Sequence, residues 1–346
     1  MTLTSCAGVR DIPADPFAER RGPVSGVERQ ILGGHFRFES GSEALLGLVD
    51  AAYARVPAHR LPVAETEFRI ELRLVSRPAP PHNAEPPVVR LQSGAGLICG
   101  VMDAANYVVL DPAQRRALVV AAEDMLLWPY HLRYELIEFA VFTLATRGLG
   151  LVPLHGACVG RDGRGILLLG ASGAGKSTLA LHSLLLGLDF LAEDAVFVQP
   201  ERMLATGVAN FLHVQADALR FVDDERSRRW LASAPVIRRR SGVEKFEADL
   251  RLGHGRLAPK PLALAGAVFV SSQLADDPAM LLAPIPADAI AARLRADQPY
   301  ASTQPGWSRF ERQLIARGVY ELRRGAHPRA AVEALRQLLP VVGVPA

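Results

Sequence analysis

The segment from Gly170 to Ser177 reads GASGAGKS and fits the pattern G-x-x-x-x-G-K-S, which is typical of a loop that binds polyphosphates. Glycine reaches backbone angles that a β-carbon forbids, so the N–H groups of such a loop can converge on phosphate oxygens. The first turn of a following helix adds positive charge for the same anion. An incidental glycine-rich turn is the alternative interpretation. The residues expected to contact the nucleotide are Gly170, Ser172, Gly173, Ala174, Gly175, Lys176, Ser177 and Thr178.

Lysine is rare in this chain, because only Lys176, Lys245 and Lys260 occur among 39 basic residues. Arginine supplies the positive charge almost everywhere else. A lysine at the glycine-rich loop therefore indicates a need for a compact ammonium group, since a planar guanidinium fits such a narrow nest badly.

Three further features could take part in phosphate chemistry. His155 ends an apolar stretch, where a buried core histidine is the alternative. Glu193 and Asp194 interrupt another apolar stretch, and carboxylates there are costly to bury unless they meet a cation or hydrogen-bond donors. They could bind Mg²⁺ on a nucleotide, or they could be solvated acids at a strand end. The basic segment 238–245 could face a phosphoryl group or could be a solvated surface.

These residues need a strand–loop–helix frame to bring them together. Apolar runs predict a strand at 165–169 before the glycine-rich loop and a helix at 177–186 after it. Neighbouring strands are expected at 151–159, which contains His155, and at 190–198, with the acidic pair in its middle. Farther on, we expect a strand at 262–270 and helices at 217–231, 287–295, 308–322 and 330–339.

The first part of the chain has a different pattern, with short strands and no chemical signature. We expect a flexible lead-in over 1–26, a small β-rich domain over 27–130 and a catalytic domain over 131–346. A proline-rich link at 77–87 is expected to be a loop. The strands are expected at 35–39, 67–75, 88–91, 97–101, 107–110 and 117–121, and helices at 44–56 and 132–147.

Composition excludes several functional classes. The net charge of +3 and the dispersed basic residues do not indicate a nucleic-acid partner. No apolar run reaches the roughly 18 residues expected of a membrane span. Three cysteines without a C-x-x-C spacing suggest neither a zinc site nor a disulfide framework. We therefore expect a cytoplasmic protein that binds neither nucleic acid nor membrane.

Three segments, at their mutual spacing, resemble the catalytic domain of HPr kinase/phosphorylase and its serine-kinase relatives. They read LHG at 154–156, GASGAGKST at 170–178 and AEDAV at 192–196. The resemblance covers residues 150–200 well and the first 130 residues not at all. It implies an α/β P-loop kinase fold shared with phosphoenolpyruvate carboxykinase, in which a mixed sheet carries flanking helices.

The resemblance also implies roles for individual residues. In the family the strand histidine, the loop lysine and the second acidic residue are catalytic, and these correspond to His155, Lys176 and Asp194. The loop hydroxyl, Ser177 here, binds magnesium, and Glu193 is the expected second metal ligand. The family's aspartate takes the proton of a serine hydroxyl as its oxygen attacks the γ-phosphoryl group of ATP.

The sequence departs from the family at two of these positions. Thr178 stands where HPr kinases usually carry a glutamate, and Glu193 stands where they carry an aspartate. A glycine-rich signature used for the reverse, phosphorolytic reaction is missing, so phosphorylase activity is not expected. The relatives without it are often associated with peptide modification, which makes the serine of a peptide or small protein the expected acceptor. HPr kinases are hexamers, and a homo-oligomer stays open for this chain.

The sequence therefore predicts a kinase that uses ATP and Mg²⁺ to phosphorylate a hydroxyl. Arg240 or Lys245 is expected to add positive charge around the transferred group. Two alternatives stay open. One is a nucleotide-gated binding module, and the other is a plain NTPase in which water is the acceptor.

Overall fold

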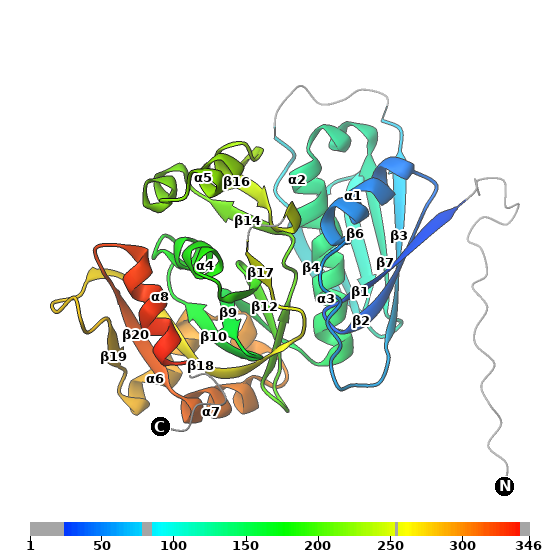
Figure 1. Cartoon of the computed structure of the whole chain (residues 1–346). Helices are drawn as coiled ribbons and strands as arrows, with labels where there is room; N and C mark the ends of the chain where they lie inside the picture. The colour runs from blue at the N-terminus through cyan, green and yellow to red at the C-terminus, as the bar shows by residue number, and fades with distance from the viewer. Residues whose placement is uncertain (1–23, 78–84, 253–254, 340–346) are drawn as a thin grey trace, which may run out of the picture.

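The computed structural model describes residues 24–77, 85–252 and 255–339. Over these ranges the chain is a mixed α/β protein with two large sheets and a small one (Figure 1). The expected lead-in and the proline-rich link lie mostly outside the described residues. None of the described helices combines the length and apolar character that crossing a membrane requires.

The N-terminal part forms a seven-stranded sheet in the order β1-β2-β3-β7-β6-β5-β4. The strand expected at 67–75 is present, and its alternating apolar residues Phe68, Ile70 and Leu72 are all buried in the core. The strands are β1 (Ser25–Ile31), β2 (Gly34–Ser40), β3 (Glu67–Val75), β4 (Arg90–Gly94), β5 (Leu97–Asp103), β6 (Asn106–Asp111) and β7 (Arg116–Ala122).

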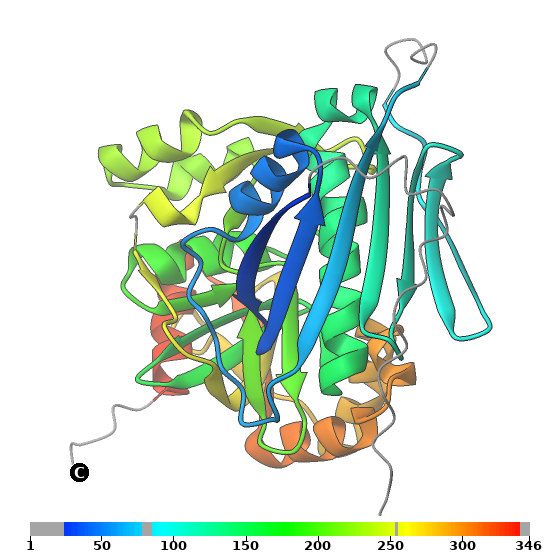
Figure 2. The same cartoon turned by 90° about the vertical axis from the view of Figure 1, so that its right-hand side faces the viewer.

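Helices complete the core of this sheet (Figure 2). The expected helix at 132–147 begins with one stretch of π-helix and continues as a regular α-helix. Its buried residues, among them Leu136 and Leu144, join the core cluster of the N-terminal sheet. The packing thus groups this helix with the first sheet, whereas the sequence predicts that residues from 131 onward belong to the second part. The helices are α1 (Glu43–Tyr53), η1 (Glu123–Leu127), α2 (Pro129–His131), η2 (Leu132–Glu138) and α3 (Phe139–Leu149).

The second large sheet has ten strands and carries the glycine-rich loop. Its main order is β17-β11-β9-β10-β18-β13-β12-β8, and β20 pairs with β18 and β19. β10, β18 and β20 run parallel to one another. The strands are β8 (Val152–His155), β9 (Ala157–Arg161), β10 (Arg164–Leu169), β11 (Asp189–Ala192), β12 (Ala195–Gln199), β13 (Leu204–Gly207), β17 (Arg256–Leu257), β18 (Leu262–Leu274), β19 (Leu282–Pro284) and β20 (Val319–Arg324).

Two separate cores hold helices against this sheet. One core contains α4 (Lys176–Leu185) and α8 (Pro328–Gln337), and the other contains α6 (Ala287–Asp297) and α7 (Trp307–Arg317). The helix expected at 308–322 is too long, because the chain turns at Gly318 and continues as β20. Gly318 has a φ of 105°, which ends the helix there.

A three-stranded sheet in the order β14-β16-β15 lies beside α4 (Figure 1). The single helix expected at 217–231 is divided into a 3₁₀ segment and a short α-helix, separated by the cap of Asp224 on Ser227. These elements are β14 (Phe211–Val214), η3 (Ala216–Phe221), α5 (Glu225–Ala232), β15 (Val236–Arg238), β16 (Glu244–Asp249) and η4 (Leu250–Leu252); η5 (Ala301–Thr303) lies farther along the chain.

Two expected strands are each broken at, or directly beside, a candidate site residue. The run at 151–159 splits at Gly156 into β8 and β9, which pair with different partners in the sheet. The run at 190–198 splits at Glu193 and Asp194 into β11 and β12. The N–H of Gly156 donates to the carbonyl of Asp194 at 3.1 Å, so the two breaks lie side by side. Glu193 and Asp194 therefore lie between two strands, where their side chains are not confined to the two faces of the sheet, and His155 is the last residue of β8.

Replacing Gly156 by alanine is expected to lower the free energy of unfolding by about 1–3 kcal/mol. A β-carbon at this position would lie 2.7 Å from the carbonyl oxygen of Leu168, which is closer than packed atoms allow. Urea unfolding measures the change. Gly47→Ala is the matched control, because Gly47 lies in α1 with no atom near its missing β-carbon, and alanine there should stabilise the helix by about 0.5–1 kcal/mol.

Candidate active site

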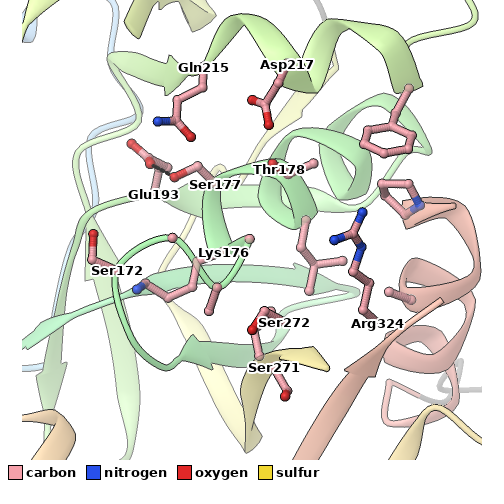
Figure 3. Close-up of a pocket in the computed structure, with 18 of the residues that line it drawn as sticks. Ser172, Lys176, Ser177, Thr178, Glu193, Gln215, Asp217, Ser271, Ser272 and Arg324 are labelled. Carbon is pink, nitrogen blue, oxygen red and sulfur yellow. Dashed lines mark hydrogen bonds between the residues drawn. The ribbon is translucent and has the colours of Figure 1, made fainter. Parts of the chain in front are cut away.

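The glycine-rich loop joins β10 to the first residue of α4, and its glycines adopt the positive φ angles that a β-carbon would disfavour. Gly170 has a φ of 124°, and a β-carbon there would lie 2.7 Å from the carbonyl oxygen of Val270. The ammonium of Lys176 donates to the carbonyl oxygens of Gly170 and Ala171 at 2.5 and 3.1 Å. The lysine therefore lies across its own loop, as Figure 3 shows, with its charge inside the concave side.

The hydroxyl of Ser177, the second residue of α4, donates to the carboxylate of Glu193 (Figure 3). Glu193 follows β11 directly, and its side chain is 3% exposed. Burial favours the neutral acid, but the hydrogen bond to His213 and the charges of His213 and Lys245 together outweigh it and lower the pKa of Glu193. A buried, ionised carboxylate thus touches the loop hydroxyl.

Asp194 points to three different partners. Its carboxylate accepts hydrogen bonds from Arg239 at 3.1 Å and from the Tyr134 hydroxyl at 3.1 Å. His155 Nδ1 lies 3.4 Å from the other carboxylate oxygen. Burial alone would raise the pKa of Asp194, but the charges of Arg239 and His155 outweigh burial and lower it to about 2. Asp194 is consequently ionised at neutral pH.

His155 is held in place through its backbone rather than its ring. Its N–H donates to the side-chain oxygen of Gln298, whose amide donates back to the His155 carbonyl, both at 2.8 Å. Gln298 is buried and follows α6. The imidazole itself is 60% exposed, so the buried core position considered from the sequence is wrong.

A row of buried ion pairs extends from Glu193 away from the glycine-rich loop. His213 of β14 bridges Glu193 and Glu247, at 3.4 Å from Nδ1 and 3.1 Å from Nε2. Glu247 of β16 in turn binds Arg133 of η2. Burial disfavours charge on His213, but hydrogen bonds to both glutamates outweigh it and raise its pKa. Because Arg133 belongs to the N-terminal part, this row of ion pairs links the two halves of the molecule.

Replacing His213 by leucine is expected to lower the free energy of unfolding by about 3 kcal/mol at about pH 6, since it removes the donor shared by two buried carboxylates. The folded pKa of His213 is raised above its usual 6.5. Its stabilising contribution is therefore complete below that value and is lost as the pH rises through the folded pKa. Urea unfolding should therefore show a smaller difference in the free energy of unfolding between wild type and His213→Leu at about pH 9 than at about pH 6.

His59→Leu is the matched control for this pH dependence. His59 is also buried and contacts Thr206 Oγ1 at 2.8 Å and the carbonyl of Ala258 at 2.9 Å. Burial lowers the pKa of His59, so its contribution to the free energy of unfolding does not decrease as the pH rises above 6.5. If the loss of unfolding free energy decreased equally in both variants between about pH 6 and about pH 9, the pH effect could not be assigned to His213.

A cavity of about 470 Å³ lies over the loop and reaches beyond the first turn of α4. Lys245 and Arg239 line one end, with His155, Glu193 and Asp194, while Arg220, Phe221 and Arg324 line another part. Figure 3 shows Gln215 and Asp217 facing the loop and Arg324 beside α4. The surplus of positive side chains around a nest of backbone N–H groups can bind a polyphosphate.

The structure brings together most of the predicted site residues. His155, Lys176, Ser177, Thr178, Glu193 and Asp194 all line this cavity, as do Ser172, Gly173, Ala174 and Gly175, while Gly170 closes the loop from below. Lys245 lines it too. Arg240 does not: it binds the carboxylate of Glu135 at 2.6 Å and the carbonyl of Pro87 at 3.2 Å. The choice of Arg240 was wrong, because Glu135 of η2 and the carbonyl of Pro87 hold its guanidinium away from the cavity, and the preceding residue, Arg239, lines the cavity instead.

Tyr134, His213 and Gln298 were not predicted from the sequence, and Arg239 was covered only as part of the basic segment 238–245. Of the first three, His213 alone shows a sequence signal, because it interrupts the apolar segment FLHV much as His155 ends its own. Arg239 and Tyr134 come from segments 45 and 60 residues away from Asp194, and no local pattern relates them to it.

Ser177 and Glu193 offer a hydroxyl and a carboxylate in direct contact, which are the hard oxygen donors that Mg²⁺ prefers. The described residues hold no group of three or more His, Cys, Asp or Glu side chains suited to a metal ion. A magnesium ion here would therefore need further oxygens from a phosphate, as is usual for nucleotide-bound Mg²⁺.

A comparison with models of known protein families finds no match for this chain, and a comparison with curated proteins finds none either.

Proposed function

We propose that this chain is a P-loop kinase of the HPr-kinase-like type, which transfers the γ-phosphoryl group of ATP to the hydroxyl of a serine. The observation that carries the proposal is the meeting of two features in one cavity. The glycine-rich loop supplies a polyphosphate nest, and the ionised carboxylate of Asp194 faces the same space. Nest, metal ligands and carboxylate together are what phosphoryl transfer requires.

Each residue has a distinct part in the proposed reaction. The N–H groups of the loop and the Lys176 ammonium would bind the β- and γ-phosphate oxygens. Ser177 and Glu193 would hold Mg²⁺, which supplies charge neutralisation between the phosphates when bound. Asp194 would accept the proton of the attacking hydroxyl, and His155 would orient it.

Arg239, which belongs to the basic segment 238–245, also supports the proposal. Its guanidinium lies on Asp194 and also lines the nucleotide cavity. A guanidinium here can move to the transferred phosphoryl group, whose charge it would stabilise. Its departure would raise the pKa of Asp194 from about 2, which makes the carboxylate a better proton acceptor at the moment of transfer.

The decisive experiment incubates the full chain with Mg²⁺ and γ-labelled ATP, with and without a pool of serine peptides. Label in a peptide supports the kinase. Phosphate release alone would favour the NTPase alternative, and saturable ATP binding without turnover would favour the nucleotide-gated module. Absence of ATP binding would refute the proposal altogether.

A further inference from the structure

A second cavity, of about 900 Å³, meets the cavity over the glycine-rich loop (the nucleotide cavity) at the candidate catalytic residues. His155, Glu193, Asp194 and His213 line both spaces. The second cavity lies between the two halves of the molecule, with β4, β5 and α3 on one side and the breaks of the second sheet on the other. Asp194 can therefore be reached from two directions, and only one of them is lined by the loop.

The chemistry of the second cavity differs from that of the first. Aromatic side chains of Phe139, Phe142, Phe197 and Tyr300 line it, and no residue of the glycine-rich loop does. Its volume lies near the upper end of the range for organic ligands and far exceeds the roughly 30 Å³ of a water molecule. A space of this kind suits an acceptor with an apolar body rather than water.

One wall of the cavity is an edge strand with free backbone groups. Leu91, Gln92 and Ser93 of β4 line the cavity, and among the described strands β4 pairs with β5 alone. All five residues of β4 are exposed, including Leu91 at 64%. Such an edge can pair with another extended chain through main-chain hydrogen bonds.

The register of the hairpin shows which backbone groups are available. Gly94 pairs with Leu97 across the two-residue turn Ala95–Gly96, both of whose φ angles are positive. In a hairpin of this type the pair beside the turn is hydrogen-bonded, and bonded and non-bonded pairs then alternate. Leu91 and Ser93 fall in non-bonded pairs, so their N–H and C=O groups point away from β5 and toward an incoming strand.

We propose that the second cavity is the acceptor site and that it takes an extended peptide, a step that rests on the proposed kinase function. The peptide backbone pairs with β4, an apolar side chain fills the aromatic cavity, and a serine hydroxyl reaches Asp194. The serine oxygen forms a bond to the γ-phosphorus as the bond to the β–γ bridging oxygen breaks. That bond's electron pair leaves with ADP, and the serine proton passes to the Asp194 carboxylate.

The strand geometry makes a specific demand on the peptide sequence. Side chains two residues apart point to the same side of an extended chain, whereas adjacent ones point to opposite sides. Phenylalanine two residues before and after the serine should therefore be favoured over phenylalanine directly before and after it. The two peptides have the same composition, and kcat/KM for the first should be about tenfold higher or more.

Ser93→Pro tests the role of β4, because it removes an N–H that points to the incoming peptide and leaves the pairing with β5 intact. Its kcat/KM for the favoured peptide should fall about tenfold or more, while Ser93→Ala, which keeps the N–H, should stay within about twofold of wild type. Transfer to N-acetylserine methylamide, which is too short to reach β4, should be the same in all three proteins. Ile98→Trp, which fills the cavity from β5, should reproduce the loss if Ser93→Pro disturbs the hairpin.

Three results would overturn the acceptor site while leaving the kinase in place. They are equal rates for the two peptide isomers, unchanged peptide transfer in both Ser93→Pro and Ile98→Trp, and phosphate found by mass spectrometry on this chain in place of the peptide. Failure of the wild-type protein to transfer label to any hydroxyl, the short acceptor included, would instead refute the kinase function itself.

Discussion

Replacing Asp194 by asparagine is expected to reduce phosphoryl transfer by a factor of about 10³, within the range found for the loss of a positioned general base. The amide has nearly the same shape but cannot take up the serine proton. It also gives up the charge that holds Arg239 and His155 around it. ATP affinity should change by less than about threefold, since Asp194 does not belong to the loop. Single-turnover transfer and calorimetric titration with Mg²⁺–ATP measure the two quantities.

Asp217→Asn is the control for Asp194→Asn. It removes the same charge from a residue that faces the same cavity from η3 (Figure 3) and that forms no part of the proposed transfer step. We expect it to keep transfer within about tenfold of wild type. Full activity in Asp194→Asn would contradict the assignment of Asp194 as the base. Equal losses of transfer in both variants would show that the loss of a negative charge from the cavity, rather than the loss of a base, causes the effect.

Replacing Lys176 by methionine is expected to weaken Mg²⁺–ATP binding by about 100-fold, because it removes the ammonium that faces the phosphates from inside the loop. Lys176→Arg should fail almost as badly, since a guanidinium is too wide to lie across the loop between the carbonyls of Gly170 and Ala171. Lys245→Met is the matched control, because it removes the same ammonium group from the cavity wall. It should weaken Mg²⁺–ATP binding by less than about tenfold.

The stability of Lys176→Met separates lost binding from lost folding. Burial lowers the pKa of Lys176, despite the opposing charges of Asp297, Asp194 and Glu193. The folded protein therefore holds the ammonium at a cost in free energy. Removing it should leave the free energy of unfolding unchanged or higher. A marked destabilisation in urea would contradict this account and would attribute weak binding to a damaged loop.

The sequence predicted the parts of the site that depend on local patterns. The glycine-rich loop, Lys176 and the helix after it occupy consecutive residues, so their spacing alone determines their relation. The acidic pair was placed near the loop because a neighbouring strand was expected there, and both acids do line the cavity.

The sequence could not predict the breaks in the two strands. Residues 151–159 and 190–198 are apolar enough to form continuous strands, and what interrupts them is a contact between the two segments, from the Gly156 N–H to the Asp194 carbonyl. Long-range contacts of this kind leave no periodic signal. The same holds for Arg239, whose place on Asp194 depends on the small sheet formed by β14, β15 and β16.

The π-helix η2 has a consequence for how far this molecule can be divided. It places Tyr134 on Asp194 and Arg133 on Glu247, yet it continues into α3, whose residues are packed within the N-terminal core. A truncated chain that starts at β8 would retain every motif seen in the sequence and lose the phenol beside the carboxylate. A longer fragment that retained η2 and α3 would expose the apolar face they bury. The shortest excisable unit with an intact site is thus close to the whole described chain, and grafting the loop region alone onto another scaffold would not transplant its chemistry.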